Sequence, residues 1–262
     1  PPVVKNLIII NVIMLLATWV LGGTFGVDLT KLFGLHYFKS DFFQPYQFVT
    51  HLFMHGGLWH LFFNMFALWM FGRVLESVWG SKRFFIYFIV TGLGAAALHT
   101  FVIHLQMASI LNDIQAFNNT PSPDALAILV KDHFPEYYSQ VYSKLLDGWY
   151  SNPDNPSYIA RAQQFVKELL NFKMNIPTVG ASGAVFGVLL AFGMLFPNTQ
   201  LMLLFPPIPI RAKYFVIFYG ALELWLGLTQ PGSNIAHFAH LGGMLFGFFL
   251  IKYWKKSRSN FF

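Results

Sequence analysis

The sequence predicts an all-α, polytopic membrane protein with six transmembrane helices. Three observations lead to this fold class. Hydrophobic residues make up 55% of the 262-residue chain and charged residues only 11%, whereas a soluble domain carries roughly 25% charged residues. The apolar residues gather in six long segments, and Lys and Arg cluster in the connections between those segments and in the chain ends.

Six segments have the composition of a transmembrane helix, which needs about 20 largely apolar residues. The third contains no charged residue, and the fourth is short. The first lacks the small-residue cleavage site of a signal peptide, so we expect it to be retained. The segments run from Asn6 to Gly22, from Gly57 to Trp79, from Phe84 to His104, from Ser182 to Phe196, from Tyr214 to Leu228 and from Ile235 to Trp254.

The basic residues predict the orientation through the positive-inside rule. If Lys5 lies in the cytoplasm, the turn with Lys82 and Arg83 and the turn with Arg211 and Lys213 lie there too, as does the basic tail. Both termini are therefore expected in the cytoplasm. This orientation explains the net charge of +6 without a nucleic-acid partner. The chain has no Cys, which excludes disulfides and thiol chemistry.

One long polar segment interrupts the apolar pattern and holds most of the acidic residues. Within it, Ala125–His133 and Tyr158–Phe172 have helical periodicity, and several prolines separate such pieces. We expect residues 105–175 to form an extramembrane helical insertion. Residues 1–104 and 176–262 would form one membrane domain. Substrate capture, partner docking, a cover over the outer face and an insertion without a role are all open.

Ser182 is a candidate nucleophile at the start of the fourth segment. A single Ser among small residues is more often a helix-packing residue. At a helix start, however, unpaired backbone N–H groups and the positive end of the helix dipole can stabilise an oxyanion. A Ser hydroxyl also needs a base, and His240 near the start of the sixth segment can act as one.

Glycines predict that the fourth and sixth segments pack closely together. Each segment carries two glycines on one helical face. If these faces meet, Ser182 and His240 come within hydrogen-bonding distance near the outer ends of their helices, where water is accessible. The glycines are Gly183 and Gly187 in the fourth segment and Gly243 and Gly247 in the sixth.

The second segment carries further polar residues. His60 and Asn64 are four residues apart and share a helical face, and both can donate hydrogen bonds to an oxyanion. From spacing alone, oxyanion binding and helix packing are equally open. His51 and His55 have the spacing of zinc ligands in metalloproteases, but no Glu follows His51. We therefore expect no metal site.

Together these segments resemble the rhomboid family of intramembrane serine proteases, in a bacterial-type form with a six-helix core and a long insertion between helices three and four. The family motifs occur in order along the chain. G-x-S-G is matched by Gly180, Ser182 and Gly183, and H-x-x-x-N by His60 and Asn64. H-x-x-G-x-x-x-G is matched by His240, Gly243 and Gly247, and G-x-x-x-E-x-x-x-G by Gly72, Glu76 and Gly80.

The resemblance implies a role for each matched residue in a six-helix rhomboid-like bundle. Ser182 would attack the peptide carbonyl, and His240 would take its proton and pass it to the leaving amine. His60, Asn64 and the backbone N–H of Ser182, supported by Gly180, would hold the oxyanion. The family uses a Ser–His dyad, so the resemblance implies neither a cofactor nor a metal.

Some residues depart from the family pattern or compete with it. Phe186 occupies a position where the family often has a Tyr stacked on the catalytic His, and we expect the stacking to survive. Tyr46-Gln47 stands where the family often has Trp-Arg, in loop one, the connection between the first and second segments. His237 competes with His240 as the base, but the glycine spacing favours His240. Glu223 is expected to be a hydrogen-bonding group that faces the bundle interior, not a catalytic acid.

The expected function is hydrolysis of peptide bonds in or near transmembrane segments of other membrane proteins. The expected location is the bacterial cytoplasmic membrane, and the expected partners are the lipid bilayer and transmembrane substrates. The sequence makes no prediction of the oligomeric state. The alternative is a catalytically silent relative that binds membrane clients, although intact Ser182, His240, His60 and Asn64 argue against it. A transporter is disfavoured because the chain shows no internal repeat.

Overall fold

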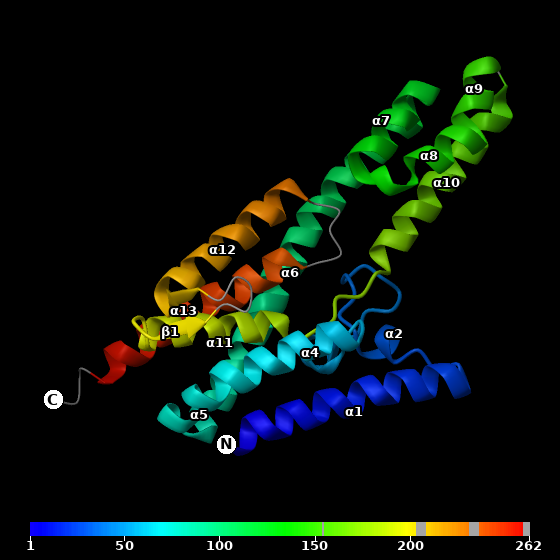
Figure 1. Ribbon diagram of the computed structural model, residues 1–262. Helices are drawn as coiled ribbons and strands as arrows, with labels where there is room; N and C mark the ends of the chain where they lie inside the picture. Colours follow the sequence, from blue (N-terminus) through cyan, green and yellow to red (C-terminus); the bar gives the residue numbers. More distant parts are fainter. Residues whose placement is uncertain (154, 203–207, 231–235, 259–262) are drawn as a thin grey trace. The chain divides into compact units, whose positions relative to one another are not determined.

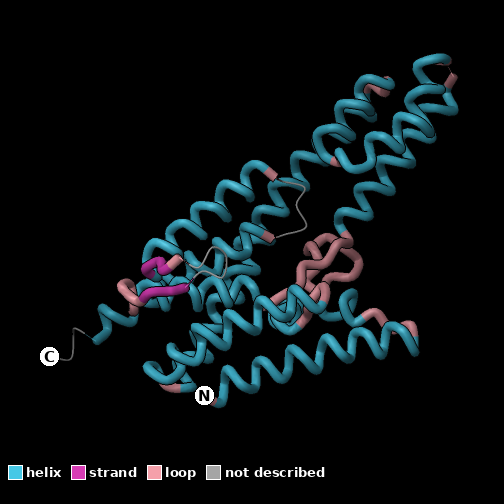
Figure 2. Tube along the Cα trace, viewed as in Figure 1, coloured by secondary structure: helices cyan, strands magenta, loops and turns pink. Residues whose placement is uncertain are grey.

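The computed structural model describes residues 1–153, 155–202, 208–230 and 236–258, and most of them are helical (Figures 1 and 2). The chain divides into two compact units. We call residues 1–36, 42–100 and 177–262 the bundle unit, and residues 37–41 and 101–176 the insert unit. The predicted all-α fold is confirmed.

The bundle unit contains a helix at each of the six predicted segments, together with short connecting elements. In chain order it comprises α1 (Pro2–Phe25), α2 (Leu29–Phe33), α3 (Gln47–Thr50), the 3₁₀ turn η1 (His51–Phe53), α4 (Leu58–Ala67), the π turn η2 (Leu68–Gly72), α5 (Arg73–Trp79), the first part of α6 (Ser81–Asn119), α11 (Ser182–Leu195), the antiparallel strands β1 (Gln200–Met202) and β2 (Pro209–Arg211), α12 (Ala212–Thr229) and α13 (His237–Arg258).

Three helical stretches in the described part of the chain are long and apolar enough to cross a membrane, judged by length and composition. They are α1, the continuous stretch Leu58–Trp79 and α6. The helix α11 is apolar but shorter, as its sequence predicted. Many side chains on α1, such as those of Ile13 and Val20, are exposed apolar groups, which suits a helix that faces lipid.

One predicted boundary was wrong. The third helix does not end near His104 but continues without a break to Asn119. Residues 105–119 contain neither Gly nor Pro, so nothing in the chain interrupts the backbone hydrogen bonding. Met107, Ile110 and Phe117 continue the helical spacing of apolar residues and are buried in the core of the insert unit.

Glu76 ties the start of α1 to the turn between α5 and α6. Its carboxylate accepts hydrogen bonds from the backbone N–H groups of Val3 (2.9 Å) and Val4 (2.8 Å) and from the Ser81 hydroxyl (2.7 Å). An anion at a helix start satisfies unpaired N–H groups and complements the helix dipole. The following turn uses Gly80 at φ 79°, a conformation that favours glycine.

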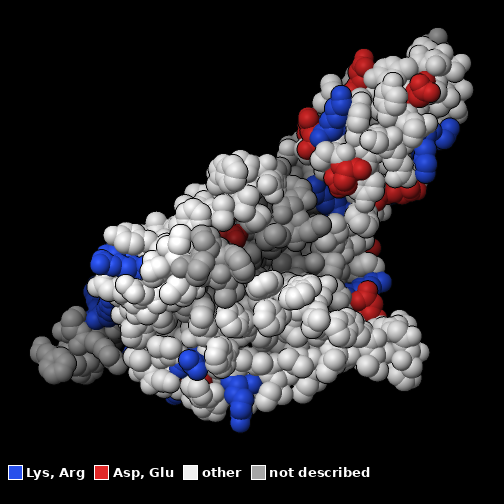
Figure 3. Space-filling model, viewed as in Figure 1, with Lys and Arg blue, Asp and Glu red and all other residues white. Residues whose placement is uncertain are grey.

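The core of the bundle unit is built around α11. Most residues of α11 from Gly183 to Gly193 are buried, and α11 packs against α12, α13 and the α4–α5 stretch. On the face seen in Figure 3, the bundle unit shows little charge, most of it from Lys and Arg, whereas the insert unit shows many groups of both signs. A central, fully packed helix gives Ser182 at its N-terminus a rigid support.

The insert unit has its own apolar core and consists of short helices. It comprises the second part of α6, α7 (Pro123–His133), the 3₁₀ turn η3 (Pro135–Tyr137), α8 (Tyr138–Val141), the π turn η4 (Tyr142–Leu146), α9 (Asp147–Ser151) and α10 (Pro156–Met174). The side chains of Leu126, Leu146 and Trp149 are almost fully buried in its core.

The two helices predicted in the insert unit are present as α7 and α10. Two of the prolines expected to separate the helical pieces are the first residues of these helices, Pro123 in α7 and Pro156 in α10. Each follows a capping side chain, because Ser122 accepts from the Ala125 N–H and Asn155 from the Ser157 N–H. Proline suits the first helical position because its missing N–H needs no partner there. The extramembrane location of residues 105–175 stays a prediction.

Candidate active site

The loop before α11 presents Ser182 at the helix start. Gly180 has φ 125°, and its N–H donates to the carbonyl of His51 at 2.9 Å. Two residues before Gly180, Thr178 forms an antiparallel backbone bridge with Leu35, and the N···O distances are 2.8 and 2.9 Å. These bonds hold the loop on both sides, so that the Ser182 side chain has a defined position.

Ser182 and His240 form the hydrogen bond expected from the packing of their helices. The Ser182 hydroxyl oxygen lies 2.9 Å from His240 Nε2. The imidazole is buried, and the ring of Phe186 stacks on it with a centroid distance of 4.1 Å and an interplanar angle of 3°. Phe186 thus keeps the stacking expected at this position.

Glu223 on α12 joins the site from a third helix. Its Oε2 atom accepts hydrogen bonds from Nδ1 of His240 at 2.9 Å and from Nδ1 of His237 at 2.6 Å. All three side chains are buried. The carboxylate is a hydrogen-bonding group in the bundle interior, as expected. The sequence did not predict that it contacts His240, because no acid lies in the fourth or sixth segment.

One sequence signal could have drawn attention to Glu223. An acidic residue in the middle of an apolar membrane helix is costly to bury and is usually paired or functional. Glu223 is the only acidic residue in α12. Sequence alone could not identify its partner, because His240 lies 17 residues away on another helix.

The four glycines lie at close contacts between helices. Gly183 and Gly243 face each other so closely that a Cβ atom on Gly243 would overlap the Gly183 carbonyl. A Cβ atom on Gly187 would meet Thr91 of α6, and one on Gly247 would meet Tyr87 of the same helix. The Tyr87 hydroxyl also donates to the Gly187 carbonyl at 2.8 Å. The small residues therefore let three helices approach, not two.

His60 lies beside the serine, against the backbone of Gly180. A Cβ atom on Gly180 would lie only 2.8 Å from Nε2 of His60 and 3.7 Å from the Ser182 hydroxyl oxygen. The N–H of Gly56 donates to Nδ1 of His60 at 3.3 Å, which leaves the proton of a neutral ring on Nε2. The Asn64 amide donates to the His60 carbonyl at 2.9 Å. His60 can therefore donate a hydrogen bond next to Ser182.

His51 and His55 do not lie on one helix, because η1 ends at Phe53. Burial lowers the pKa of His51 to about 4 and that of His55 to about 3. Nδ1 of His51 lies 2.9 Å from the Gln47 carbonyl, and its own carbonyl holds Gly180. His51 thus supports the site through its backbone.

Gln47, one of the departures from the family pattern, is the polar centre of loop one. Its side chain is completely buried. Its amide donates to the carbonyls of Leu32 (3.2 Å) and Phe42 (2.9 Å), and its oxygen accepts from the N–H groups of His36 (3.3 Å) and Gln44 (3.1 Å). A buried amide that satisfies four backbone groups holds the loop in a single conformation.

Glu223, His237 and His240 are also the one group in the described part of the chain whose His and acidic ligand atoms converge, all within 4.8 Å. The two direct hydrogen bonds of 2.6 and 2.9 Å are shorter than the roughly 3.3 Å that separates neighbouring ligands around tetrahedral zinc. The present arrangement therefore fits hydrogen bonding better than metal binding.

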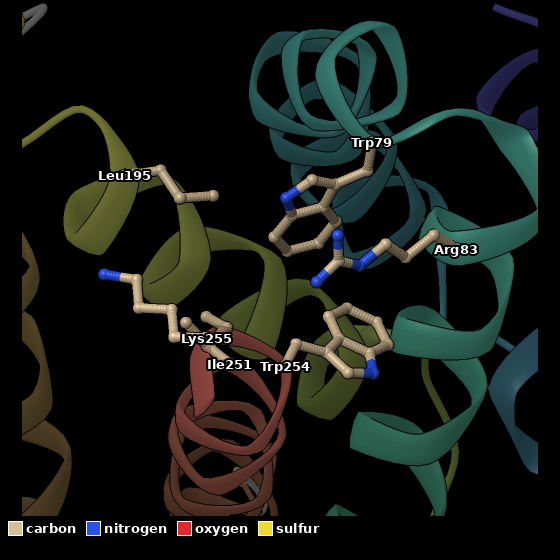
Figure 4. A pocket seen from close by; sticks show the side chains of 6 residues that line it. All are labelled: Trp79, Arg83, Leu195, Ile251, Trp254 and Lys255. Carbon is tan, nitrogen blue, oxygen red and sulfur yellow. The ribbon is translucent and has the colours of Figure 1, made fainter. Parts of the chain in front are cut away.

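A separate hollow of about 120 Å³ is lined by none of the site residues. Figure 4 shows Trp79, Arg83 and Trp254 among its lining residues, with Leu195, Ile251 and Lys255. The Arg83 guanidinium lies 4.1 Å from the ring centroid of Trp254 and 5.8 Å from that of Trp79. Tryptophan and arginine together are typical of the boundary between membrane and water.

Comparisons with known proteins show which family the chain resembles. The rhomboid domain family model matches residues 43–111 and 157–256. The chain is 25% identical over 214 residues to the mitochondrial rhomboid protein 1 of Saccharomyces cerevisiae, an alignment that covers 79% of the chain and 42% of the relative. It is 28% identical over 218 residues to an uncharacterized mitochondrial rhomboid protein of Schizosaccharomyces pombe, covering 79% of the chain and 51% of the relative.

A shorter match joins the chain to the chloroplastic rhomboid-like protein 11 of Arabidopsis thaliana, with 32% identity over 74 residues, 28% of the chain and 26% of the relative. The chain thus spans about half the length, or less, of the curated relatives it matches. These relatives are named for mitochondria or chloroplasts. The expectation of a bacterial-type protein in a bacterial cytoplasmic membrane is therefore not supported.

Proposed function

The chain belongs to the rhomboid family, and from this premise we propose that it is an active intramembrane serine protease with Ser182 as nucleophile and His240 as base. The family is known for serine proteases that cut within membranes, and the chain is an integral membrane protein. The observation that carries the proposal is the 2.9 Å hydrogen bond between the Ser182 hydroxyl and His240 Nε2. A hydroxyl bonded to an imidazole acceptor is the arrangement that activates a serine.

The first half of the reaction forms an acyl-enzyme. The Ser182 oxygen bonds to the carbonyl carbon of the scissile peptide while its proton moves to Nε2 of His240. The negative charge that develops on the carbonyl oxygen is stabilised by the backbone N–H of Ser182 and by the Nε2–H of His60, with Asn64 and Gly180 supporting them. His240 then gives its proton to the leaving amine as the C–N bond breaks.

The second half releases the acyl group. A water molecule gives a proton to His240 and attacks the ester carbonyl, and the proton returns to the Ser182 oxygen as the ester bond breaks. We expect no metal or cofactor to take part. Phe186, stacked on His240, limits the tilt of the imidazole throughout.

The substrate is expected to be a transmembrane segment of another membrane protein in the lipid bilayer. A helix hides its backbone carbonyls in hydrogen bonds, so small or helix-destabilising residues near the cleavage site should help the segment to become extended. Both termini of the protease are expected on the side of the membrane that carries the basic connections. The insert unit is expected outside the membrane, because its surface carries charges of both signs.

The experiment is cleavage of a fluorescently labelled transmembrane substrate by purified protein in detergent. Wild type, Ser182→Ala and His240→Ala are compared, with and without a metal chelator. Each variant is expected to lose at least about 1,000-fold in kcat, and the chelator to have no effect. Cleavage that survives in Ser182→Ala, or that the chelator stops, would refute a serine mechanism.

Labelling with a fluorophosphonate probe provides a second measurement that needs no natural substrate. The probe phosphonylates an activated serine, so wild type should be labelled and Ser182→Ala should not. If wild type neither cleaves several transmembrane substrates nor reacts with the probe, a catalytically silent relative that binds membrane clients becomes the better explanation.

A further inference from the structure

Glu223 is the feature of the site that the Ser–His dyad leaves unexplained. We propose that Glu223 is a positioning residue that makes Ser182 and His240 part of a Ser–His–Glu triad, and that His237 holds this acid in place. The inference rests on the proposed protease function and deepens it. It is drawn from the two hydrogen bonds to Glu223 Oε2 and from the stacking of Phe186 on His240.

The hydrogen bonds determine where the protons lie on His240. A carboxylate can only accept hydrogen bonds, so Nδ1 of His240 must carry a proton to donate to Glu223. In a neutral ring, Nε2 is then unprotonated and accepts from the Ser182 hydroxyl. Glu223 therefore selects the one tautomer of His240 in which the nitrogen facing the serine can act as a base.

Glu223 also fixes which way round the His240 ring lies in its plane, which aromatic stacking leaves free. Phe186 lies parallel to the His240 ring at 3°, which fixes the plane of the imidazole. A half-turn of the ring about its Cβ–Cγ bond leaves that plane unchanged but replaces Nε2 by a carbon atom opposite Ser182. Apart from the Ser182 hydroxyl itself, the Nδ1–Glu223 bond is the described contact that distinguishes the two orientations. Phe186 and Glu223 thus fix the ring in complementary ways.

Because Glu223 is buried, its carboxylate depends on the hydrogen bonds from the two histidines. A carboxylate away from water is very costly unless it is hydrogen-bonded, and Glu223 is 6% exposed. His240 provides one donor and His237 the other. When His240 takes the proton of Ser182, the nearby negative charge stabilises the imidazolium that forms. His237 lies on the same helix as His240 and anchors the carboxylate. None of the described hydrogen bonds joins His237 to Ser182.

The test compares Glu223→Gln with wild type in the cleavage assay, with kcat and KM measured separately and normalised to folded protein. We expect kcat to fall by about 100-fold or more while KM stays within about twofold. Phosphonylation of Ser182 should slow by a similar factor, because it needs the same base. Glu168→Gln, the same substitution at an exposed carboxylate of α10, is the matched control and should behave as wild type.

A pair of substitutions at His237 tests the anchoring role. His237→Ala removes the second donor to Glu223, whereas the amide of His237→Asn places a donor near the position of Nδ1. We expect a fall in kcat of about tenfold for His237→Ala and substantial recovery in His237→Asn. Equal activities of the two variants would refute the role of His237.

The outcomes separate this inference from the proposed function. If wild type cleaves and is labelled but Glu223→Gln keeps kcat within about threefold of wild type, the protein is a dyad protease and the triad is refuted. If wild type neither cleaves nor is labelled, the protease function itself fails. If Glu223→Gln melts more than a few degrees below wild type and its folded fraction has normal kcat, Glu223 is only structural and the triad is also refuted.

Discussion

The bundle unit and the insert unit bury different kinds of side chain. Among the described residues, buried polar groups such as Glu76, Asn64 and Glu223 belong to the bundle unit, and Ser40 is the one found in the insert unit. The insert unit has an interior of aliphatic and aromatic residues, and its His133 Nε2 lies 2.6 Å from the exposed carboxylate of Asp113. Its polar groups thus lie mostly at its surface.

This difference shows where the buried polar groups of the bundle unit lie. A polar group buried in an apolar surrounding costs free energy unless it is hydrogen-bonded. In the bundle unit these groups form connected sets, at the start of α1 around Glu76, in loop one around Gln47, and at the candidate site around Glu223. The first two sets hold elements together, and the third contains the residues proposed to carry out chemistry.

Among the substitutions that compare the two units, Gly243→Ala in the bundle unit is expected to have the largest effect. The added methyl group overlaps the Gly183 carbonyl, which is backbone and cannot move aside, so α11 and α13 must separate and carry Ser182 away from His240. We expect cleavage to fall by at least about 100-fold, since a displacement of about 1 Å can have this effect. The measurement is kcat in the cleavage assay.

Gly23→Ala on α1 is the matched control for Gly243→Ala. A Cβ atom there meets nothing within 4 Å, so activity and melting temperature should stay close to those of wild type. Activity of Gly243→Ala equal to that of Gly23→Ala would show that close approach of α11 and α13 is not needed.

A substitution in the core of the insert unit should have a large effect that leaves the chemistry intact. Trp149→Ala removes an almost fully buried side chain and should destabilise the insert unit by about 3–5 kcal/mol. Because the proposed site residues all belong to the bundle unit, we expect Ser182 to react with the fluorophosphonate at the wild-type rate. Hydrogen exchange measured peptide by peptide would show increased exchange in residues 101–176. Loss of labelling would show that the two units are coupled.

The smallest of these effects is a dependence of stability on pH in the bundle unit. Burial holds the pKa of His51 near 4 and that of His55 near 3, against about 6.5 in an unfolded chain. Between these pH values the unfolded state binds more protons than the folded state. The contribution of the two histidines to the free energy of unfolding is therefore fully present above about pH 6.5 and is lost as the pH is lowered. We expect the melting temperature of the bundle unit to decrease from pH 7 to pH 5.

His55→Gln provides the control for the pH dependence, since glutamine does not titrate. The decrease in melting temperature from pH 7 to pH 5 should be smaller in this variant than in wild type. An identical decrease in both would mean that His55 does not contribute to it.

Much of the fold followed from sequence because it depends on local properties of the chain. The six apolar segments form helices because of their own composition, and the insert helices near residues 125–133 and 158–172 followed from periodicity. The contact between Ser182 and His240 was also predictable, because Gly183 and Gly243 mark the faces that approach. The end of the third helix at Asn119 was missed because the prediction followed residue polarity, which changes near His104. The backbone stays helical through that change.

The sequence by itself determined the membrane class, the helices and the residues whose side chains can support chemistry, since these depend on composition, spacing and residue type. Beyond the pairing of Ser182 with His240, only the tertiary structure decided what those residues contact. Glu223 meets His237 and His240 because three helices converge around α11, and Gly187 and Gly247 face α6 for the same reason. Such contacts depend on the rotation and crossing of whole helices, which are set by packing over their full length and leave no local trace in the chain.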